Sequence, residues 1–231
     1  MYDIDNIYIP KDTIQKENKD PDYTKSLKVI LTIVVRDKDG RVINRFKKRS
    51  HSPTSNFIGF MIPYTWYNST GEGWSIVNTS NGSNGWKPNT NNYGFGIVYP
   101  NSGTNYSSYL VGIVVGSGAS SNPYSMYNLA APISNGSGAG QLMYGTPSIP
   151  TSFTINGSEA YFIISQSYTN NSGGTVNITE VGLVVYLQAD GYYGTPIVYG
   201  NVLVWYDTLS SAVSLTNGSS ITVYYTFAVN P

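Results

Sequence analysis

Apolar and β-branched residues recur in short runs separated by turn residues, and this pattern dominates the second half of the chain. Within residues 160–168, Phe162 and Ile164 alternate with Tyr161 and Ile163, so both faces of a strand would carry apolar side chains. Similar runs occur at 109–115, 175–187, 197–206 and 220–229. No helical period accompanies them. The pattern therefore predicts an antiparallel β-sandwich of jelly-roll or immunoglobulin-like type, with at most one or two short helices.

A β-hairpin is predicted near the start of the regular strands. Strands at 27–36 and 41–46 are joined by the turn Asp37-Lys38-Asp39-Gly40, in which Asp-Gly favours a tight reversal. The same Asp-x-Asp-Gly order begins a calcium loop, but the later acidic ligands of such a loop are missing. Residues 55–62, which stop at Pro63, predict one short helix or a buried crossing segment.

The pattern divides the chain into an extended N-terminal arm at 1–26 and a sandwich at 27–231, which contains a long aromatic and Asn-rich insert at about 64–108. Within the sandwich, residues 180–183 carry apolar side chains on both faces, which predicts a central strand. We expect the arm to dock outside its own sandwich, on a neighbouring subunit or a shell. Its apolar residues are Tyr2, Ile4, Ile7, Tyr8 and Ile9. A solvated tail is the alternative.

Composition favours a protein that works through surface contacts. Charged residues make up 11% of the chain, well below the roughly 25% of a typical soluble domain, while Tyr occurs 21 times. Tyr presents an apolar ring with a polar tip, which suits contact with neighbouring molecules. The absence of Cys excludes disulfides and thiolate metal sites. Residues 1–22 lack the apolar core of a signal peptide, and no apolar run reaches the roughly 20 residues of a membrane-spanning helix.

Charge is distributed unevenly along the chain. Residues 1–49 contain 12 of the 13 Lys and Arg residues and 8 of the 13 acids, which gives them a net charge of +4. A basic patch is predicted at Arg45, Lys47, Lys48 and Arg49. It suits the phosphates of packaged nucleic acid or an acidic protein partner. Without a helix to read bases, contact with nucleic acid would not be sequence-specific.

The residues give little support for catalysis. His51 is the only histidine, so no second His shares a metal or a proton relay with it. A carboxylate pair for glycoside hydrolysis is available among the acids after residue 50, which are Glu72, Glu159, Glu180, Asp190 and Asp207. No motif fixes two of them together, and no glycine-rich loop carries the Lys of a phosphate site. We therefore expect no catalytic residue, no metal and no cofactor.

Two sets of residues indicate contacts with sugars. Trp66, Trp74 and Trp86 lie in the insert, where they would stack on a host glycan, contact a neighbouring subunit or fill the core. Asn-x-Ser/Thr sequons are confined to the region after residue 61. They occur at Asn68, Asn78, Asn81, Asn105, Asn135, Asn156, Asn170, Asn177 and Asn217. Their distribution is consistent with an outward-facing, glycosylated C-terminal region.

Four groups of segments follow one another along about half of the chain. They are 34–43 with 49–52 and 56–57, then 112–118 with 127–133, then Thr179-Glu180-Val181-Gly182-Leu183, and finally 202–207 with 218–225. In this order they resemble the opening, the middle segment, the Glu-Val-Gly-Leu strand and the closing strand pair of virion proteins. Those proteins come from viruses of hyperthermophilic archaea and from the tails and fibres of some tailed phages. The insert at 64–108 has no counterpart in the resemblance.

The resemblance implies a virion structural protein with a turret, tail, spike or vertex role, and it brings no catalytic residues. We therefore expect a non-enzymatic component that self-assembles into or onto a virus particle and is located in the virion. Its expected partners are other copies of itself, other virion proteins and a host surface glycan or receptor. Two alternatives stay open, namely a receptor- or glycan-binding adhesin and, as a minor one, a polysaccharide-degrading enzyme.

Overall fold

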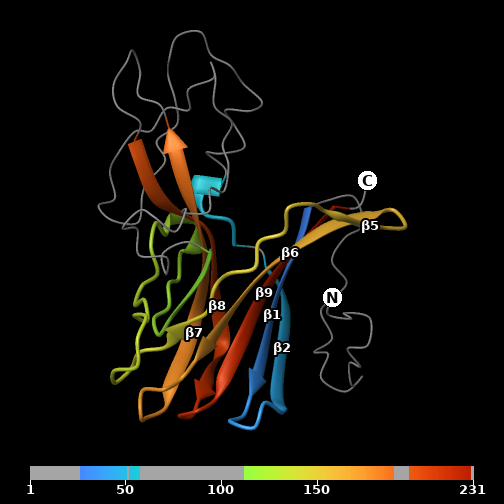
Figure 1. The fold of residues 1–231 in the computed structure, drawn as a ribbon. Helices are drawn as coiled ribbons and strands as arrows, with labels where there is room; N and C mark the ends of the chain where they lie inside the picture. Colours follow the sequence, from blue (N-terminus) through green and yellow to red (C-terminus); the bar gives the residue numbers. More distant parts are fainter. Residues whose placement is uncertain (1–26, 51, 58–111, 190–197, 230–231) are drawn as a thin grey trace.

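β-Strands make up most of the part of the chain that the computed structural model describes, which is residues 27–50, 52–57, 112–189 and 198–229. The strands form two antiparallel sheets that pack face to face (Figure 1), which confirms the predicted all-β sandwich. Helix in these residues is limited to a turn at 55–57 and the 3-10 helix η3 (Pro123–Ser125). Neither is long or apolar enough to span a membrane.

The larger sheet, called sheet A, has the strand order β2-β1-β9-β6-β4, and β5 pairs with β6. Its strands are β1 (Leu27–Arg36), β2 (Val42–Ser50), β4 (Met143–Tyr144), β5 (Thr154–Asn156), β6 (Glu159–Thr169) and β9 (Ser220–Val229). The smaller sheet, called sheet B, consists of β3 (Gly112–Gly116), β7 (Val176–Ala189) and β8 (Val198–Leu215), in the order β3-β7-β8. Because β7 is the middle strand, the prediction of a central strand at 180–183 is confirmed.

The Asp-Gly turn predicted between the first two strands is present. Asp37 Oδ1 accepts the backbone N–H groups of Asp39 and Arg41, each at 2.9 Å. Gly40 has a φ of 81°, a left-handed conformation that costs glycine least. The hairpin that results is longer than predicted, since β2 continues to Ser50.

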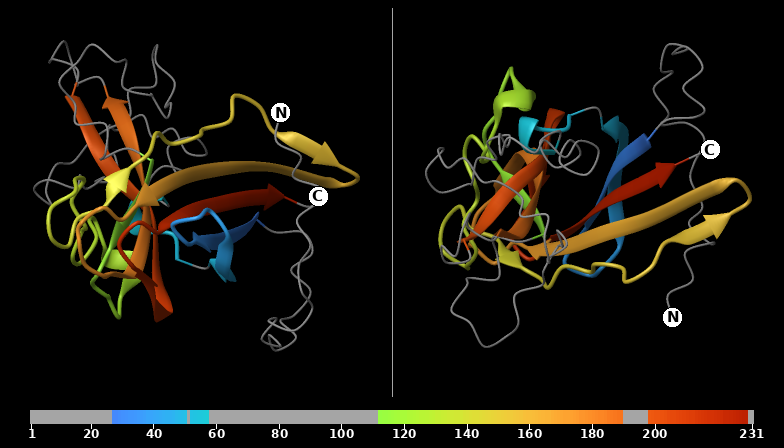
Figure 2. Two further views of the ribbon diagram at one scale, coloured as in Figure 1. Left: turned by 60° about the horizontal axis from the view of Figure 1, so that its bottom comes forward. Right: turned by 90° about the horizontal axis from the view of Figure 1, so that it is seen from above.

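The hydrophobic core lies between the facing surfaces of the two sheets, and strand alternation determines which residues enter it. In β9, Val223 and Tyr225 are fully buried, whereas the intervening positions are half-exposed. The same one-sided pattern occurs in β6, where Ile164 is buried and Ile163 is only partly covered. Residues 160–168 are therefore not covered on both faces as predicted, because sheet B packs on only one face of sheet A (Figure 2).

One side of the sandwich is closed by the chain itself. After β2 the chain leaves sheet A and pairs with β8 of sheet B. Thr54 N–H donates to Val204 O at 3.1 Å, and Tyr206 N–H donates to Ser52 O at 3.0 Å. This crossing pairs with residues 204–206 at the edge of β8 and connects sheet A directly to sheet B.

The opposite side is closed by side chains of β6 that reach the backbone of β3. Gln166 Oε1 accepts the Ile113 N–H at 2.9 Å, and Gln166 Nε2 donates to Gly145 O at 2.9 Å. The Tyr168 hydroxyl donates to Ile113 O at 2.6 Å, and both Gln166 and Tyr168 are buried. The side chains of Gln166 and Tyr168 thus bind the backbone of β3 in place of the hydrogen bonds that a neighbouring strand would form.

Replacing Tyr168 with Phe should lower the free energy of unfolding by about 1–3 kcal/mol, because the buried Ile113 carbonyl loses its donor. Urea unfolding followed by circular dichroism measures this change. Tyr224→Phe, on the half-exposed outer face of β9, is the matched control and should change stability by less than about 0.5 kcal/mol. Equal stabilities of the two variants would contradict the role given to Tyr168.

Candidate interaction surfaces

The predicted basic patch divides between the two faces of β2. Arg45, Lys47 and Arg49 occupy alternate positions and pair in register with Val34, Thr32 and Ile30 of β1. Their side chains therefore lie on the outer face of sheet A, whereas Lys48 points to the opposite face. Among the described residues, ion pairs form at Lys48 and Arg41 and at none of these three outward cations. The patch thus contains three residues rather than four.

Lys48 takes part in a buried ion pair at the junction of the two sheets. Its Nζ lies 2.9 Å from Asp207 Oδ1 and donates to Thr208 O at 2.9 Å. Asp207 is fully buried, and Lys48 is this oxygen's only polar partner among the described residues. A carboxylate removed from water in this way costs several kcal/mol unless a cation compensates it. Lys48 therefore has a structural role inside the fold.

The other oxygen of Asp207 is held by two hydroxyl groups. Ser50 Oγ donates to Asp207 Oδ2 at 2.6 Å, and the Tyr225 hydroxyl donates to it at 2.9 Å. Trp205 Nε1 in turn donates to Ser50 Oγ. Burial, followed by the charge of Asp207, raises the pKa of Tyr225 well above its usual range. The network connects β2 and β9 of sheet A with β8 of sheet B.

A second buried carboxylate, Glu180 of β7, fixes the loop that covers the outer face of sheet B. Its Oε1 accepts the N–H groups of Ala131 at 2.7 Å and Gly118 at 3.1 Å, and its Oε2 accepts the Ala130 N–H at 3.0 Å. The Tyr206 hydroxyl donates to Oε2 at 2.8 Å, and burial raises the pKa of Tyr206 to about 12. Four donors therefore satisfy this carboxylate.

The two buried carboxylates do not form a catalytic pair. Glu180 is opposite Thr208 in the β7–β8 ladder and Asp207 is opposite Val181, so their side chains point to opposite faces of sheet B. Each is occupied by protein donors. The described residues also contain no group of three or more His, Asp or Glu that could hold a metal ion. Glu72 and Asp190 lie outside the described residues, as does His51.

The core-facing side of sheet A continues past the cover of sheet B as an uncovered apolar row. Leu27, Val229, Ala160 and Ile155 are direct cross-strand neighbours on β1, β9, β6 and β5. Their positions place them on the same side as the buried core residues. The exposed fractions are nevertheless 43% for Leu27, 47% for Val229 and 68% for Ile155. Figure 1 shows this end of β6 and β5 extending away from sheet B. We call these four residues the apolar end of sheet A.

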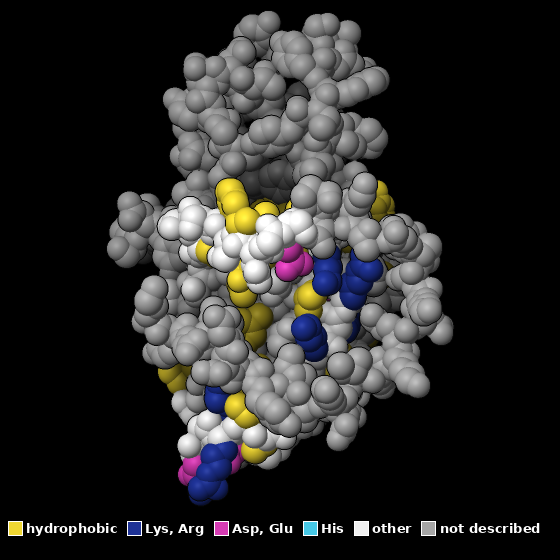
Figure 3. Space-filling view, turned by 90° about the vertical axis from the view of Figure 1, so that its right-hand side faces the viewer, with side chains coloured by type: hydrophobic (Ala, Val, Ile, Leu, Met, Phe, Trp, Pro, Cys, Tyr) yellow, Lys and Arg dark blue, Asp and Glu magenta, His cyan; other side chains and the backbone are white. Residues whose placement is uncertain are grey.

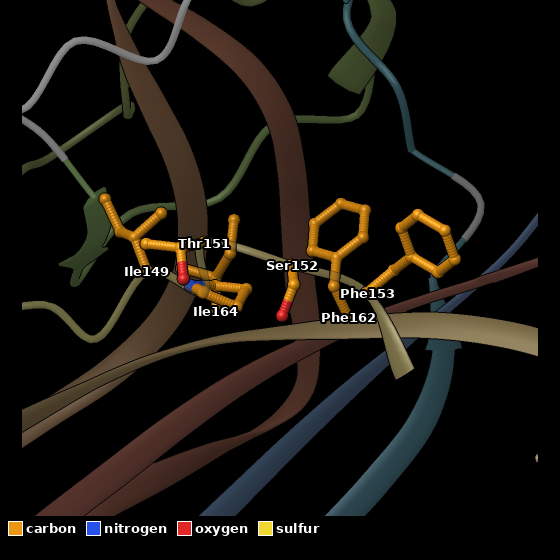
Figure 4. A pocket seen from close by; sticks show the side chains of 7 residues that line it. Ile149, Thr151, Ser152, Phe153, Phe162 and Ile164 are labelled. Atoms are coloured by element: carbon orange, nitrogen blue, oxygen red, sulfur yellow. The ribbon is translucent and has the colours of Figure 1, made fainter. Parts of the chain in front are cut away.

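An apolar groove of about 320 Å³ adjoins the apolar end. It lies between the segment 149–153 and the side chains of Phe162 and Ile164 on β6 (Figure 4). Phe153 at its rim is 64% exposed, while Phe162 stacks on Phe227 of the core with ring centroids 5.0 Å apart. The groove therefore joins the uncovered surface to the packed interior.

The other predicted contact residues are only partly within the described structure. Residues outside the described part are Tyr2, Ile4, Ile7, Tyr8, Ile9, Trp66, Trp74, Trp86, Asn68, Asn78, Asn81 and Asn105. Exposed sequon residues are Asn135, Asn156, Asn177 and Asn217. Asn170 differs, since it is fully buried and its Nδ2 donates to Gly174 O at 2.8 Å and to Leu215 O at 2.7 Å. Its side chain leaves no room for a glycan, which corrects the expectation at this sequon.

Replacing Lys48 with Met should lower the free energy of unfolding by about 3 kcal/mol, because Asp207 would stay buried without its cation. This value is at the low end of the usual range, since the Lys48 side chain keeps 28% exposure. Lys47→Met, which removes an outward-facing cation, should change it by less than about 0.5 kcal/mol. Urea unfolding at neutral pH compares the two variants, and similar losses in both would refute the buried ion pair.

Comparisons of this chain with protein-family models, curated proteins and solved structures find no match.

Proposed function

We propose that this protein is a structural subunit that assembles with other copies of itself, and that the assembly is a virus particle. The apolar end of sheet A supports the proposed assembly with other copies. Fully burying a large apolar side chain is worth roughly 1.5–3 kcal/mol. Leu27, Ile155 and Val229, together with Phe153, therefore favour contact with a neighbouring molecule.

The interior supports a mechanical role. Asp207 and Glu180 are both fully buried, and each holds together elements that are distant in sequence. Neither leaves a free oxygen facing an open cleft of the described structure. Buried charges arranged in this way stabilise one defined arrangement of the sheets, which a subunit in a repeated assembly requires.

The virus-particle half of the proposal is supported by the sequence. Segments from 34–43 to 218–225 resemble virion structural proteins in the same order, and the low content of charged residues suits a surface that is largely covered by neighbours. The proposed mechanism is burial of apolar surface and pairing of strand edges, without a chemical step.

Replacing Phe153 and Ile155 together with Ser should abolish or strongly weaken self-association, because both side chains are exposed and their loss removes apolar contact area without opening the core. Light scattering coupled to size-exclusion chromatography gives the mass in solution, and negative-stain electron microscopy shows ordered assemblies. Circular dichroism confirms that the variant is folded.

Tyr124→Ser is the matched control, since Tyr124 is 54% exposed on η3, away from the apolar end, and should assemble like the wild type. A wild type that stays monomeric at its highest soluble concentration would overturn the proposed function. Unchanged assembly of the Phe153 and Ile155 variant would show that the apolar end is not the contact.

A further inference from the structure

We propose that the open edge of β2 accepts the N-terminal segment of a second copy of this chain, residues 2–9, as an additional antiparallel strand of sheet A. The inference rests on the proposed function and names one contact by which the copies would assemble. Three observations support it: an open strand edge, a row of cations without ion-pair partners, and an acidic segment with matching alternation.

The first observation is the edge itself. β2 ends the strand order of sheet A, and no described strand pairs with its outer side (Figure 1). β2 is nine residues long, so its edge offers a run of backbone N–H and C=O groups for another strand. Sheet B is paired further at both edges, by the chain after β2 next to residues 204–206 of β8 and by residues 131–133 next to β3. Among the described residues, no such pairing covers the outer edge of β2.

The second observation is the charge beside this edge. Arg45, Lys47 and Arg49 stand on the outer face of β2 at every second residue, a spacing of about 6.6–6.8 Å. Among the described residues none of them has an ion-pair partner. Figure 3 shows Lys and Arg side chains gathered on this side of the molecule. Cations on an edge strand repel a second basic strand, and they attract one that carries acids at the same spacing.

The third observation is a segment of this chain with that alternation. Acids two residues apart occur at three places in the sequence, which are Asp3 with Asp5, Asp20 with Asp22, and Asp37 with Asp39. Asp37 and Asp39 are in the β1–β2 turn, and a Pro separates Asp20 from Asp22. Asp3 and Asp5 alone have apolar neighbours suited to a strand, which then ends at Pro10.

The alternation of the two segments fixes a register. In an antiparallel pairing that places Asp5 opposite Lys47, Asp3 lies opposite Arg49 and Ile9 lies opposite Ile43. The acids thus meet cations, and Ile9 covers a side chain that is 60% exposed. The other face of residues 2–9, with Tyr2, Ile4 and Tyr8, turns toward the side of β2 that carries Phe46. The added strand is then complementary to β2 at Asp3, Asp5 and Ile9, while Ile7 lies opposite Arg45.

The same pairing within one chain is disfavoured by residues 10–26, which would have to connect the added strand to β1. A strand antiparallel to β2 is parallel to β1, so residues 10–26 would have to form a crossover back to the start of β1 at Leu27. Crossovers normally pack an apolar face against their sheet. Residues 10–26 are polar, with Ile14 and Tyr23 as their only large apolar side chains. A segment from another copy needs no such crossover.

Disulfide trapping tests the contact directly, because the chain contains no Cys. Protein with Ile9→Cys is mixed with protein with Ile43→Cys under mild oxidation, and non-reducing gels with mass spectrometry identify the products. The proposal expects a mixed disulfide dimer. The control pairs Ile9→Cys with Tyr124→Cys, which is exposed elsewhere, and should give little mixed dimer. Yields equal to this control would overturn the inference.

The Ile9→Cys and Ile43→Cys changes are also combined in one chain. A bond formed only within that chain, with no mixed dimer from the separate proteins, would show pairing in cis and would overturn the inference. If the wild type assembles while mixed dimers are absent, the inference fails and the proposed function stands. If the wild type remains monomeric, both fail.

Charge exchange gives an independent readout. Asp3→Lys with Asp5→Lys should weaken assembly by about tenfold, because two attractive pairs become repulsive. Adding Lys47→Glu and Arg49→Glu in the same chain should restore it, since the opposite charges then face each other again. Unimpaired assembly of the Asp variants, or no recovery in the fourfold variant, would contradict the register. Raised ionic strength should reduce the difference between the variants.

Discussion

The buried charge of Asp207 is the constraint on which the arrangement of the two sheets depends. An isolated carboxylate in this position would cost several kcal/mol, so the fold must bring donors to it from elsewhere in the chain. Those donors are Lys48 and Ser50 from β2 and Tyr225 from β9, while Asp207 itself is in β8. The donors of sheet A therefore meet the acceptor of sheet B where β2 leaves one sheet and its continuation joins the other.

This junction determines what β2 presents to the outside. Because Lys48 and Ser50 are turned inward by the network, strand alternation directs Lys47 and Arg49 outward. The interior thus uses one cation of the basic patch and leaves its neighbours on the surface. Glu180 has the corresponding role on the far face of sheet B, where it fixes the loop at 117–131 against the sheet. The loop covers the part of that face around Glu180 and Tyr206, whereas Asn177 and Ser214 of the same sheet are exposed.

Local features of the structure could be read from the sequence, and contacts between distant residues could not. Alternation and turn residues predicted the strands, the Asp37–Gly40 turn and the central place of residues 180–183, because each depends on neighbours along the chain. The division of the basic patch was also predictable, since Lys47 and Lys48 are adjacent and adjacent residues of a strand point to opposite faces. The partners of Asp207 and Glu180 were not, because they come from up to about 160 residues away. No feature of the sequence next to Gln166 and Tyr168 indicates that their side chains bind the backbone of β3.

The two sheets differ in what they leave open, and the proposed assembly rests on this difference. Sheet B is covered on its outer face around Glu180 and Tyr206 and is paired along part of each edge, and its acidic groups are satisfied. Sheet A keeps an uncovered apolar end at β5 and an unpaired, cationic edge at β2, which are separated by β1, β9 and β6. Two distinct surfaces on one sheet allow each copy to contact two different neighbours. If the rotation from one copy to the next returns to the first copy after a whole number of steps, the copies form a closed ring. If it does not, they form an assembly that continues to grow, such as a filament. A rigid sandwich is suited to such contacts, because the angle between neighbours is then set by the fold rather than by a flexible hinge.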